Sequence, residues 1–146
     1  MADPNTERIA AELEIRNVLA QFARLADTGD TDTYVQFMTP DIVWSMPANP
    51  GLGLPASERH GRDEIATGQR ERTAAGVQGE GSNTMHLVTT TLVDVQSDDA
   101  ATADSYFMFV TATTTTPSIQ NVGRYHDQFR RTPEGWKLAR REIQFG

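Results

Sequence analysis

Apolar side chains recur every three or four positions over the first forty residues, which is the spacing of one face of an α-helix. Asp3-Pro4 predicts the start of the first helix, because aspartate caps free backbone N–H groups and proline suits the first turn. Thr28-Gly29 predicts its end. Asp30 begins a shorter second helix that stops at Pro40. The second helix carries Tyr34, Phe37 and Met38 on one side, and the stripe of the first consists of Ile9, Ile15, Val18, Leu19, Phe22, Leu25 and Ala26.

Beyond the second helix the pattern changes to that of strands and loops. Residues 41–46 predict a short strand. Residues 47–55 hold three prolines and two glycines, which predicts an irregular covering loop, and residues 62–73 predict a weak helix followed by a loop over 76–81. Four long β-rich segments follow, and the turn-forming residues between them make them antiparallel neighbours. These segments are 84–95, 101–115, 119–131 and 136–145.

Helices followed by a meander of strands predict an α+β fold, formed as one domain over residues 1–146. A curved antiparallel sheet of about four to six long strands must twist and curl. Helices laid across its concave side leave a cone-shaped, barrel-like interior. We therefore expect an interior pocket that holds a small, largely apolar molecule.

The charge balance narrows the class of partner. The 146 residues include 20 Asp and Glu against 13 Lys and Arg, which gives a net charge of −7. Phosphate groups repel such a chain, so we expect neither nucleic acid nor an anionic membrane surface as a partner. The chain has no cysteine, which excludes disulfides and thiolate chemistry. No segment approaches the ~20 apolar residues of a membrane span, and the polar N-terminal segment differs from a secretory signal, so we expect a cytoplasmic protein.

The usual signatures of nucleophilic, nucleotide and metal sites are missing from the sequence. There is no G-x-S-x-G elbow and no P-loop. His126 and Asp127 are adjacent on a predicted strand and therefore point to opposite faces. A metal centre would need His60 and His86 to converge, which their spacing does not support. We expect no metal and no cofactor.

Asp27 and His86 are the two residues that suggest chemistry. Asp27 lies in the last turn of the first helix, where a carboxylate meets the negative end of the helix dipole, and a turn aspartate bonded to the backbone is the alternative. His86 has apolar neighbours on both faces of its predicted strand and shares its own face with Thr84, Val88 and Leu92. A buried imidazole needs a partner, which is either a carboxylate that orients it for base chemistry or a backbone carbonyl.

Two tyrosines on the predicted strands could donate a hydrogen bond to a substrate oxygen. Tyr125 shares strand parity with Asn121 and Phe129 and is expected to point inward. Tyr106 shares parity with Met108. For each phenol, packing in the core is the alternative role.

Trp44 and Met46 share the strand face that a helix would cover, either as core or as pocket wall. The basic residues of the final hairpin are expected on a solvated face, where Glu134 and Glu142 neutralise them. These basic residues are Arg130, Arg131, Lys137, Arg140 and Arg141.

The order of elements and several local phrases resemble the SnoaL-like group of the nuclear transport factor 2-like fold. The resemblance extends over residues 9–143. The phrases that carry it are Leu25-Ala26-Asp27-Thr28-Gly29-Asp30, Phe37-Met38-Thr39-Pro40-Asp41-Ile42-Val43-Trp44, His60-Gly61-Arg62-Asp63-Glu64-Ile65, Met85-His86-Leu87-Val88, Gly123-Arg124-Tyr125-His126-Asp127 and Gly135-Trp136-Lys137-Leu138.

This resemblance implies an Asp–His dyad, because scytalone dehydratase and a hexachlorocyclohexane dehydrochlorinase of the group use one. Asp27 and His86 match the two dyad positions, and Trp44 and Tyr125 match pocket residues of the dehydratase. The chain has Ala26 in place of the tyrosine beside the dehydratase aspartate and lacks its second pocket histidine, so the groups that polarise the substrate differ. The resemblance also implies a homodimer that forms through the outer side of the sheet.

We interpret the sequence as a cofactor-independent lyase or isomerase, such as a dehydratase, isomerase or cyclase. His86 would abstract a proton from a polyketide-, steroid- or aromatic-like substrate, Asp27 would orient its ring, and Tyr125 would stabilise the developing negative charge. The alternatives are a non-catalytic binding protein or accessory subunit with the same pocket, and a hydrolase- or oxygenase-like protein that activates water. The expected substrate contacts are Trp44, Met46, Tyr34, Val88, Tyr106 and Asn121.

Overall fold

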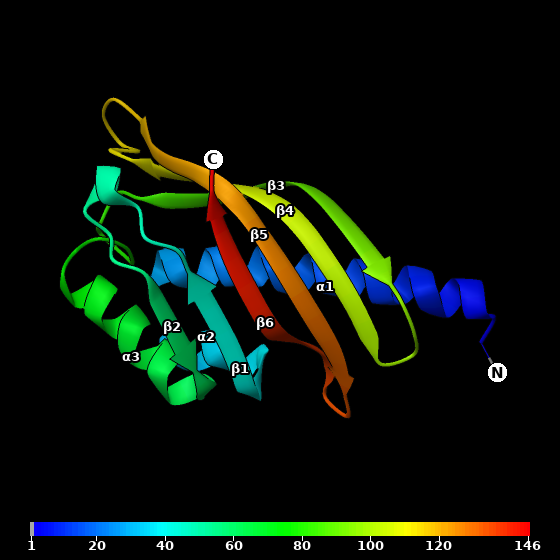
Figure 1. The fold of residues 1–146 in the computed structure, drawn as a ribbon. Helices are drawn as coiled ribbons and strands as arrows, with labels where there is room; N and C mark the ends of the chain where they lie inside the picture. The colour runs from blue at the N-terminus through cyan, green and yellow to red at the C-terminus, as the bar shows by residue number, and fades with distance from the viewer. Residues whose placement is uncertain (1) are drawn as a thin grey trace.

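One six-stranded sheet curves around the long first helix in the computed structural model, which describes residues 2–146 (Figure 1). This arrangement confirms the predicted α+β class. The helices are α1 (Pro4–Thr28), α2 (Thr31–Gln36) and α3 (Gly61–Ala74), with a short 3₁₀ helix η1 (Pro50–Leu52). The strands are β1 (Met38–Met46), β2 (Ser57–His60), β3 (Met85–Val95), β4 (Ala100–Thr111), β5 (Ser118–Thr132) and β6 (Gly135–Phe145), in the spatial order β2-β1-β6-β5-β4-β3.

The sheet is mixed and open, whereas a wholly antiparallel, barrel-like sheet was expected. Strands β3 to β6 form the predicted antiparallel meander, but β1 pairs with β6 in parallel. All the other strands separate β1 from β6 along the chain, so no short turn forces the two to run in opposite directions. The edges at β2 and β3 stay apart, so the sheet curls without closing.

Local chemistry sets both ends of α1 as predicted. The Asp3 side chain accepts a hydrogen bond from the first turn, and Gly29 ends the helix with a left-handed φ of 82° while its N–H bonds to the carbonyl of Leu25. Ile9, the predicted first residue of the stripe, is exposed. No helix within residues 2–146 is long and apolar enough to cross a lipid bilayer. The buried stripe of α1 consists of Ala11, Ile15, Val18, Leu19, Phe22 and Ala26.

Strand β1 begins earlier than predicted, and α2 is correspondingly shorter. Met38 and Pro40, which were assigned to the end of the second helix, belong to β1. The cause is a contact with the last strand, because the backbone N–H of Leu138 donates to the carbonyl of Phe37 at 2.9 Å. A shift in register between Met38 and Val43 accommodates the proline, which has no N–H to contribute to the sheet.

The short strand β2 was not predicted. Its sequence, Ser57–His60, is wholly polar and lacks the apolar alternation that identifies a half-buried strand. It forms because the preceding segment turns back, so that β2 pairs antiparallel with the end of β1, with Arg59 opposite Trp44. Tertiary pairing, and not local preference, creates this strand.

A bulge divides β3 into two parts that face differently. Thr90 has a φ of 54°, and the pairing with β4 shifts between Thr89 and Leu92. An extra residue in one strand reverses the alternation of its side chains. Leu92 is therefore 74% exposed and does not share the inward face of His86, which corrects the sequence-based assignment.

Gly123 provides a test of the packing on the concave face of the sheet. A Cβ atom at this position would lie 2.3 Å from the carbonyl oxygen of Gln144 and 2.6 Å from the ring of Phe107. Since overpacking costs about 1–3 kcal/mol, we expect Gly123→Ala to lower the free energy of unfolding in urea by that amount. Gly51→Ala is the control, because its Cβ would lie 3.4 Å from the nearest side-chain atom. Equal stability of the two variants would contradict this packing.

Candidate functional site

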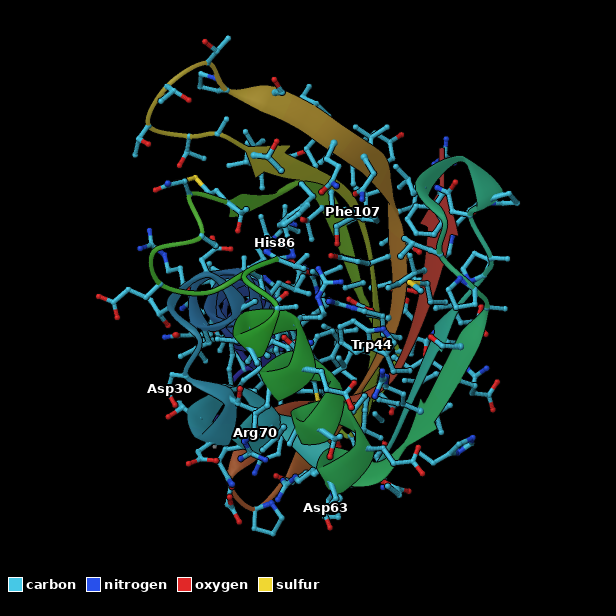
Figure 2. All side chains as sticks on the ribbon, turned by 90° about the vertical axis from the view of Figure 1, so that its left-hand side faces the viewer. Asp30, Trp44, Asp63, Arg70, His86 and Phe107 are labelled. Carbon is cyan, nitrogen blue, oxygen red and sulfur yellow. The ribbon has the colours of Figure 1, made fainter. Side chains whose placement is uncertain are left out.

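A cavity of about 320 Å³ lies between the concave face of the sheet and the helices, within the ~300–1,000 Å³ range of small-molecule sites. Figure 2 shows His86, Phe107 and Trp44 directed into the space between the curved sheet and the helices. Leu54 and Pro55, from the predicted covering loop, also line the cavity. The chain thus has the interior pocket that the sequence predicts.

The fold gathers almost all the predicted site residues around this cavity. Asp27 lies behind the wall, where it contacts His86, and Tyr106 is the one predicted residue that lies elsewhere. The predicted residues that line the cavity are Tyr34, Trp44, Met46, His86, Val88, Asn121 and Tyr125.

The end of α1 and the start of β3 meet through the side chain of Asp27. Its Oδ1 lies 2.8 Å from Nδ1 of His86, and its two oxygens accept the backbone N–H of the same residue at 3.1 and 3.2 Å. Only 21% of the Asp27 side chain and 15% of the His86 side chain are exposed. The unfavourable position of this carboxylate at the helix C-terminus is thus offset by N–H groups from another element.

The contact with Asp27 determines how the His86 ring presents itself to the cavity. A carboxylate only accepts hydrogen bonds, so the Nδ1 atom carries a proton. Within residues 2–146 the Nε2 atom forms no hydrogen bond, and in the neutral ring it holds the free lone pair. The ring packs against Phe109, with 4.7 Å between ring centroids. His86 can therefore act as a base whose orientation is fixed on two sides.

Two buried phenols face the same cavity. Tyr34 is 3% and Tyr125 is 7% exposed, and neither hydroxyl group bonds to another group within residues 2–146. Burial raises the pKa of both tyrosines, and the nearby positive charge of Arg141 only partly opposes the rise. Both therefore remain protonated at neutral pH and can donate hydrogen bonds. The ring of Phe107 stacks on Tyr125 at 4.5 Å and holds it in place.

Arg141 is buried inside the fold, contrary to its predicted place on a solvated face. Its Nε and Nη2 atoms each donate to one oxygen of Asp127 at 2.8 Å, and the side chains are 3% and 0% exposed. Its guanidinium lies 3.8 Å from the ring centre of Tyr125. Burial alone would lower the pKa of Arg141, but the paired carboxylate outweighs that effect and raises it. Because both oxygens of Asp127 are engaged, this carboxylate does not offer a free base for water activation.

The signal for this pair was present in the sequence. Arg141 shares strand parity with Ile143 and Phe145, and Asp127 shares parity with Phe129, so alternation places both inside. The neighbouring basic residues obscured that pattern. The prediction holds for Arg140, which is partly exposed and pairs with Glu142. Lys137 pairs with Glu134 as expected, but it is only 8% exposed, so its predicted place on a solvated face is wrong.

Two more arginines line the cavity and were missed by sequence reasoning. Arg59 lies on β2, a strand that was not predicted, so nothing indicated its direction. Arg72 lies on α3 seven positions after the buried Ile65, and this helical spacing could have identified it as inward-facing.

Tyr106 lies on the outer face of the sheet and is 48% exposed, which corrects its assignment as a substrate contact. Its neighbours Phe107 and Phe109 face inward and line the cavity. The side chains of a strand alternate, so Tyr106 must point the other way. The guanidinium of Arg124 covers its ring at 5.4 Å.

Metal-ligating residues do not cluster in the part of the chain that the structure describes. Residues 2–146 contain no group of three or more His, Cys, Asp or Glu side chains that could hold a metal ion. His126 faces outward and bonds to Asp104 at 2.5 Å, and Asp127 faces inward, as their adjacent positions predict.

Comparison with known proteins identifies relatives of this fold. A family model described as a SnoaL-like domain matches residues 7–142. A nuclear transport factor 2-like protein with a cystatin-like fold from Novosphingobium aromaticivorans superposes with a TM-score of 0.83 at 25% identity, covering 99% of this chain and 91% of the other. No curated protein matches the sequence.

Two further structures from the same organism share the fold. A candidate scytalone dehydratase has a TM-score of 0.74 at 17% identity, covering 97% of this chain and 88% of its own. The β subunit of a candidate aromatic-ring-hydroxylating dioxygenase has a TM-score of 0.72 at 18% identity, covering 94% and 90%. At these identities the likeness concerns the fold alone.

The buried ion pair gives a stability prediction. Arg141→Met leaves the carboxylate of Asp127 buried without its partner, so we expect the free energy of unfolding to fall by about 3–5 kcal/mol. The double variant Arg141→Met/Asp127→Leu should recover most of that loss, since no charge then stays buried. Unfolding in guanidinium chloride measures both, with Arg140→Met at the exposed pair as the control. A single variant no less stable than this control would contradict the assignment.

Proposed function

Because this chain belongs to the SnoaL-like domain family of the nuclear transport factor 2-like superfamily, we propose that its cavity catalyses cofactor-independent proton transfer leading to elimination, isomerisation or cyclisation. The observation that carries the proposal is the hydrogen bond between Asp27 and His86, which leaves Nε2 of a cavity-lining imidazole without a partner in residues 2–146. Asp27, His86 and Tyr125 are the proposed catalytic residues.

His86 acts as the general base in this mechanism. Its Nε2 atom takes a proton from a carbon next to a carbonyl group, and the electron pair of the broken C–H bond moves into the carbonyl to form an enolate. The ring then carries a positive charge, which the Asp27 carboxylate at 2.8 Å stabilises. A positioned base of this kind contributes about 10²–10⁴-fold to the rate.

Tyr125 supplies the hydrogen-bond donor for the enolate oxygen. Its hydroxyl group is protonated at neutral pH and has no partner within residues 2–146. Removing one such donor from an active site costs about 10²–10³-fold in rate. Tyr34 lies in the same wall and is a second donor.

The fate of the enolate decides the reaction type. In a dehydration, the enolate expels a β-hydroxyl group that takes the proton from the His86 imidazolium and leaves as water. In an isomerisation, the same proton returns to another carbon of the substrate. Protons and a leaving group move, and no electrons enter or leave, so the cycle requires no redox cofactor.

The walls of the cavity favour a ring-shaped substrate of modest size. Phe107, Phe109 and Trp44 contribute aromatic surface, and Met46 and Val88 add aliphatic surface. A polyketide-, steroid- or aromatic-like skeleton would bury its apolar face against them. Asn121 would contact a polar group of such a molecule.

Deuterium exchange tests the base without knowledge of the natural substrate. The bicyclic ketone 2-tetralone carries acidic C–H bonds, and we expect the protein to accelerate their exchange in deuterium oxide, as followed by NMR. His86→Gln should lower the accelerated rate by at least about 10²-fold, and Asp27→Asn should do so by disturbing the ring tautomer. His126→Gln, at the exposed histidine, is the matched control. Exchange that survives in both dyad variants, with unfolding still cooperative, would refute the base.

A non-catalytic role as a binding protein or accessory subunit is the second candidate. The observation in its favour is the shared fold with the β subunit of a candidate ring-hydroxylating dioxygenase. In that case compounds would bind the cavity and stabilise the fold, but no C–H bond of a bound ketone would exchange. The measurement described above therefore separates the two candidates.

The outer face of the sheet supports a proposal about assembly. Met85 and Leu87 on β3 and Val122 on β5 are exposed on either side of β4, and cross-strand pairing joins Leu87 to Met108 and Met108 to Val122. Such a patch of apolar side chains on an open sheet is typical of a protein contact. We place the interface of a homodimer here.

Light scattering during size-exclusion chromatography tests this assembly. We expect the wild-type protein to elute with twice the mass of the chain and Val122→Glu to elute as a monomer, because a buried carboxylate without a partner opposes association. Glu80→Lys, at an exposed position outside the patch, is the control. A monomeric wild-type protein would contradict the proposed interface.

A further inference from the structure

We infer that the α3 side of the cavity binds an organic carboxylate, so that the substrate is a carboxylic acid with an aromatic or alicyclic body. This inference deepens the proposed function and rests on it only for the statement that the cavity is the substrate site. The observations that carry it are two guanidinium groups, Arg59 and Arg72, which line one cavity without a carboxylate partner in residues 2–146.

Arg72 is held in place by neutral groups. Its Nε donates to Oε1 of Gln78 at 2.8 Å, and Nε2 of Gln78 donates to Oε1 of Gln69 at 2.5 Å. Gln78 is only 3% exposed, so this chain of amides is part of the fold and not a surface contact. The contacts engage one edge of the guanidinium and leave its other donors for a ligand. Burial lowers the pKa of Arg72, which shows the cost of a cation without an opposite charge.

Arg59 reaches the same side of the cavity from β2. One Nη donates to the backbone carbonyl of Glu64 at 3.0 Å, and the guanidinium lies over Gly68 in the middle of α3. A Cβ atom at Gly68 would lie 2.5 Å from this group. Glycine weakens a helix interior by about 1 kcal/mol, so its presence here is explained by the room that the cation needs. The positive charge of Arg59 is also close enough to contribute to the lowered pKa of Arg72.

The acidic side chains near the cavity do not neutralise these two cations. Asp127 is engaged on both oxygens by Arg141, and Asp27 is engaged by His86. Glu71 is an exposed residue at the wall and forms no ion pair within residues 2–146. The net charge of the chain is −7, yet the positive charges of Arg59 and Arg72 at this cavity have no acidic partner within residues 2–146.

A carboxylate matches this arrangement better than a neutral polar group. The planar fork of a guanidinium pairs with the two oxygens of a carboxylate, and such charge-assisted hydrogen bonds are about twice as strong as neutral ones. The rest of the cavity is aromatic, so the body of the ligand would extend from the arginines along Trp44 and Phe107 towards His86. Arg59 and Arg72 would then hold the substrate with its reacting carbon towards His86.

A matched pair of probes tests this inference in the wild-type protein. The compounds 2-naphthoate and 2-naphthamide have the same shape and differ in charge. We expect calorimetric titration at neutral pH to show that the naphthoate binds about 10- to 100-fold more tightly. Equal affinity, tighter binding of the amide, or binding of neither compound would overturn the inference.

Three variants locate the anion site. Arg72→Met and Arg59→Met should each reduce the preference for naphthoate to about 3-fold or less, since each removes one charged partner. Gly68→Ala should reduce it too, because the new methyl group displaces the Arg59 guanidinium without removing its charge. Arg70→Met is the control on the same helix, since Arg70 pairs with Asp32 and does not line the cavity (Figure 2). A preference that persists in both Arg→Met variants would overturn the inference.

The binding experiment tests the carboxylate site and the proton-exchange experiment tests the base, so one proposal can be refuted while the other stands. His86→Gln removes the base but keeps both arginines, so it should retain the preference for naphthoate while losing exchange of 2-tetralone. Loss of the preference with exchange intact would refute the carboxylate site alone. Absence of exchange in a protein that still prefers naphthoate would refute the catalytic proposal alone.

Discussion

Two alanines at one end of β4 and two phenylalanines at the other divide the concave face of the sheet. Ala101 and Ala103 lie in the cluster with the stripe of α1, and their small side chains allow the helix to approach the strands closely. Phe107 and Phe109 lie outside that cluster and line the cavity. The same strand therefore closes the core at one end and keeps the sheet apart from the helices at the other. The cavity that holds the proposed catalytic and binding groups exists because of this division.

The electrostatic arrangement follows from the burial that this division creates. Each buried or half-buried charge must find a partner, because the interior penalises an isolated ion. Asp127 with Arg141, and Asp27 with His86, meet that requirement across elements that are far apart in the sequence. The arginines on β2 and α3 meet it only with neutral groups. The cavity is thus positive inside an acidic protein, and a ligand of opposite charge would complete it.

The sequence indicates the parts of the fold that local chemistry controls. Asp3 and Gly29 set the ends of α1, and alternation places Tyr125 and Asp127 inside the sheet. Other features depend on pairing between distant segments, which no local pattern records. Strand β2 is polar, and the early start of β1 depends on a hydrogen bond from Leu138.

In the candidate site, too, local sequence indicates some residues, and pairing between distant segments determines the others. The meeting of Asp27 with His86 was predicted by resemblance to a family, and the unfavourable charge at the end of α1 had indicated Asp27 alone as a candidate. Arg141 was assigned to the solvent because its sequence neighbours are basic, although strand parity pointed inward. Arg59 gave no signal, because its direction depends on a strand that only tertiary pairing creates. A buried cation is therefore harder to recognise in a sequence than a buried aromatic residue, since its usual position is on the surface.

The bulge at Thr90 divides β3 into one part that lines the cavity and another that packs against the core, whereas a regular strand would present the same alternation along its whole length. On one side of it His86 and Val88 line the cavity, and on the other side Val93 and Val95 pack against the core. Each half has its own alternation of inward and outward side chains, so side chains that line the cavity can change without disturbing the valines that hold the strand to the helix. Insertion or loss of a single residue at the bulge would be far more damaging than most substitutions, because it would turn one half inside out. Diversification of this pocket in evolution is therefore expected to proceed by exchange of side chains at constant strand length.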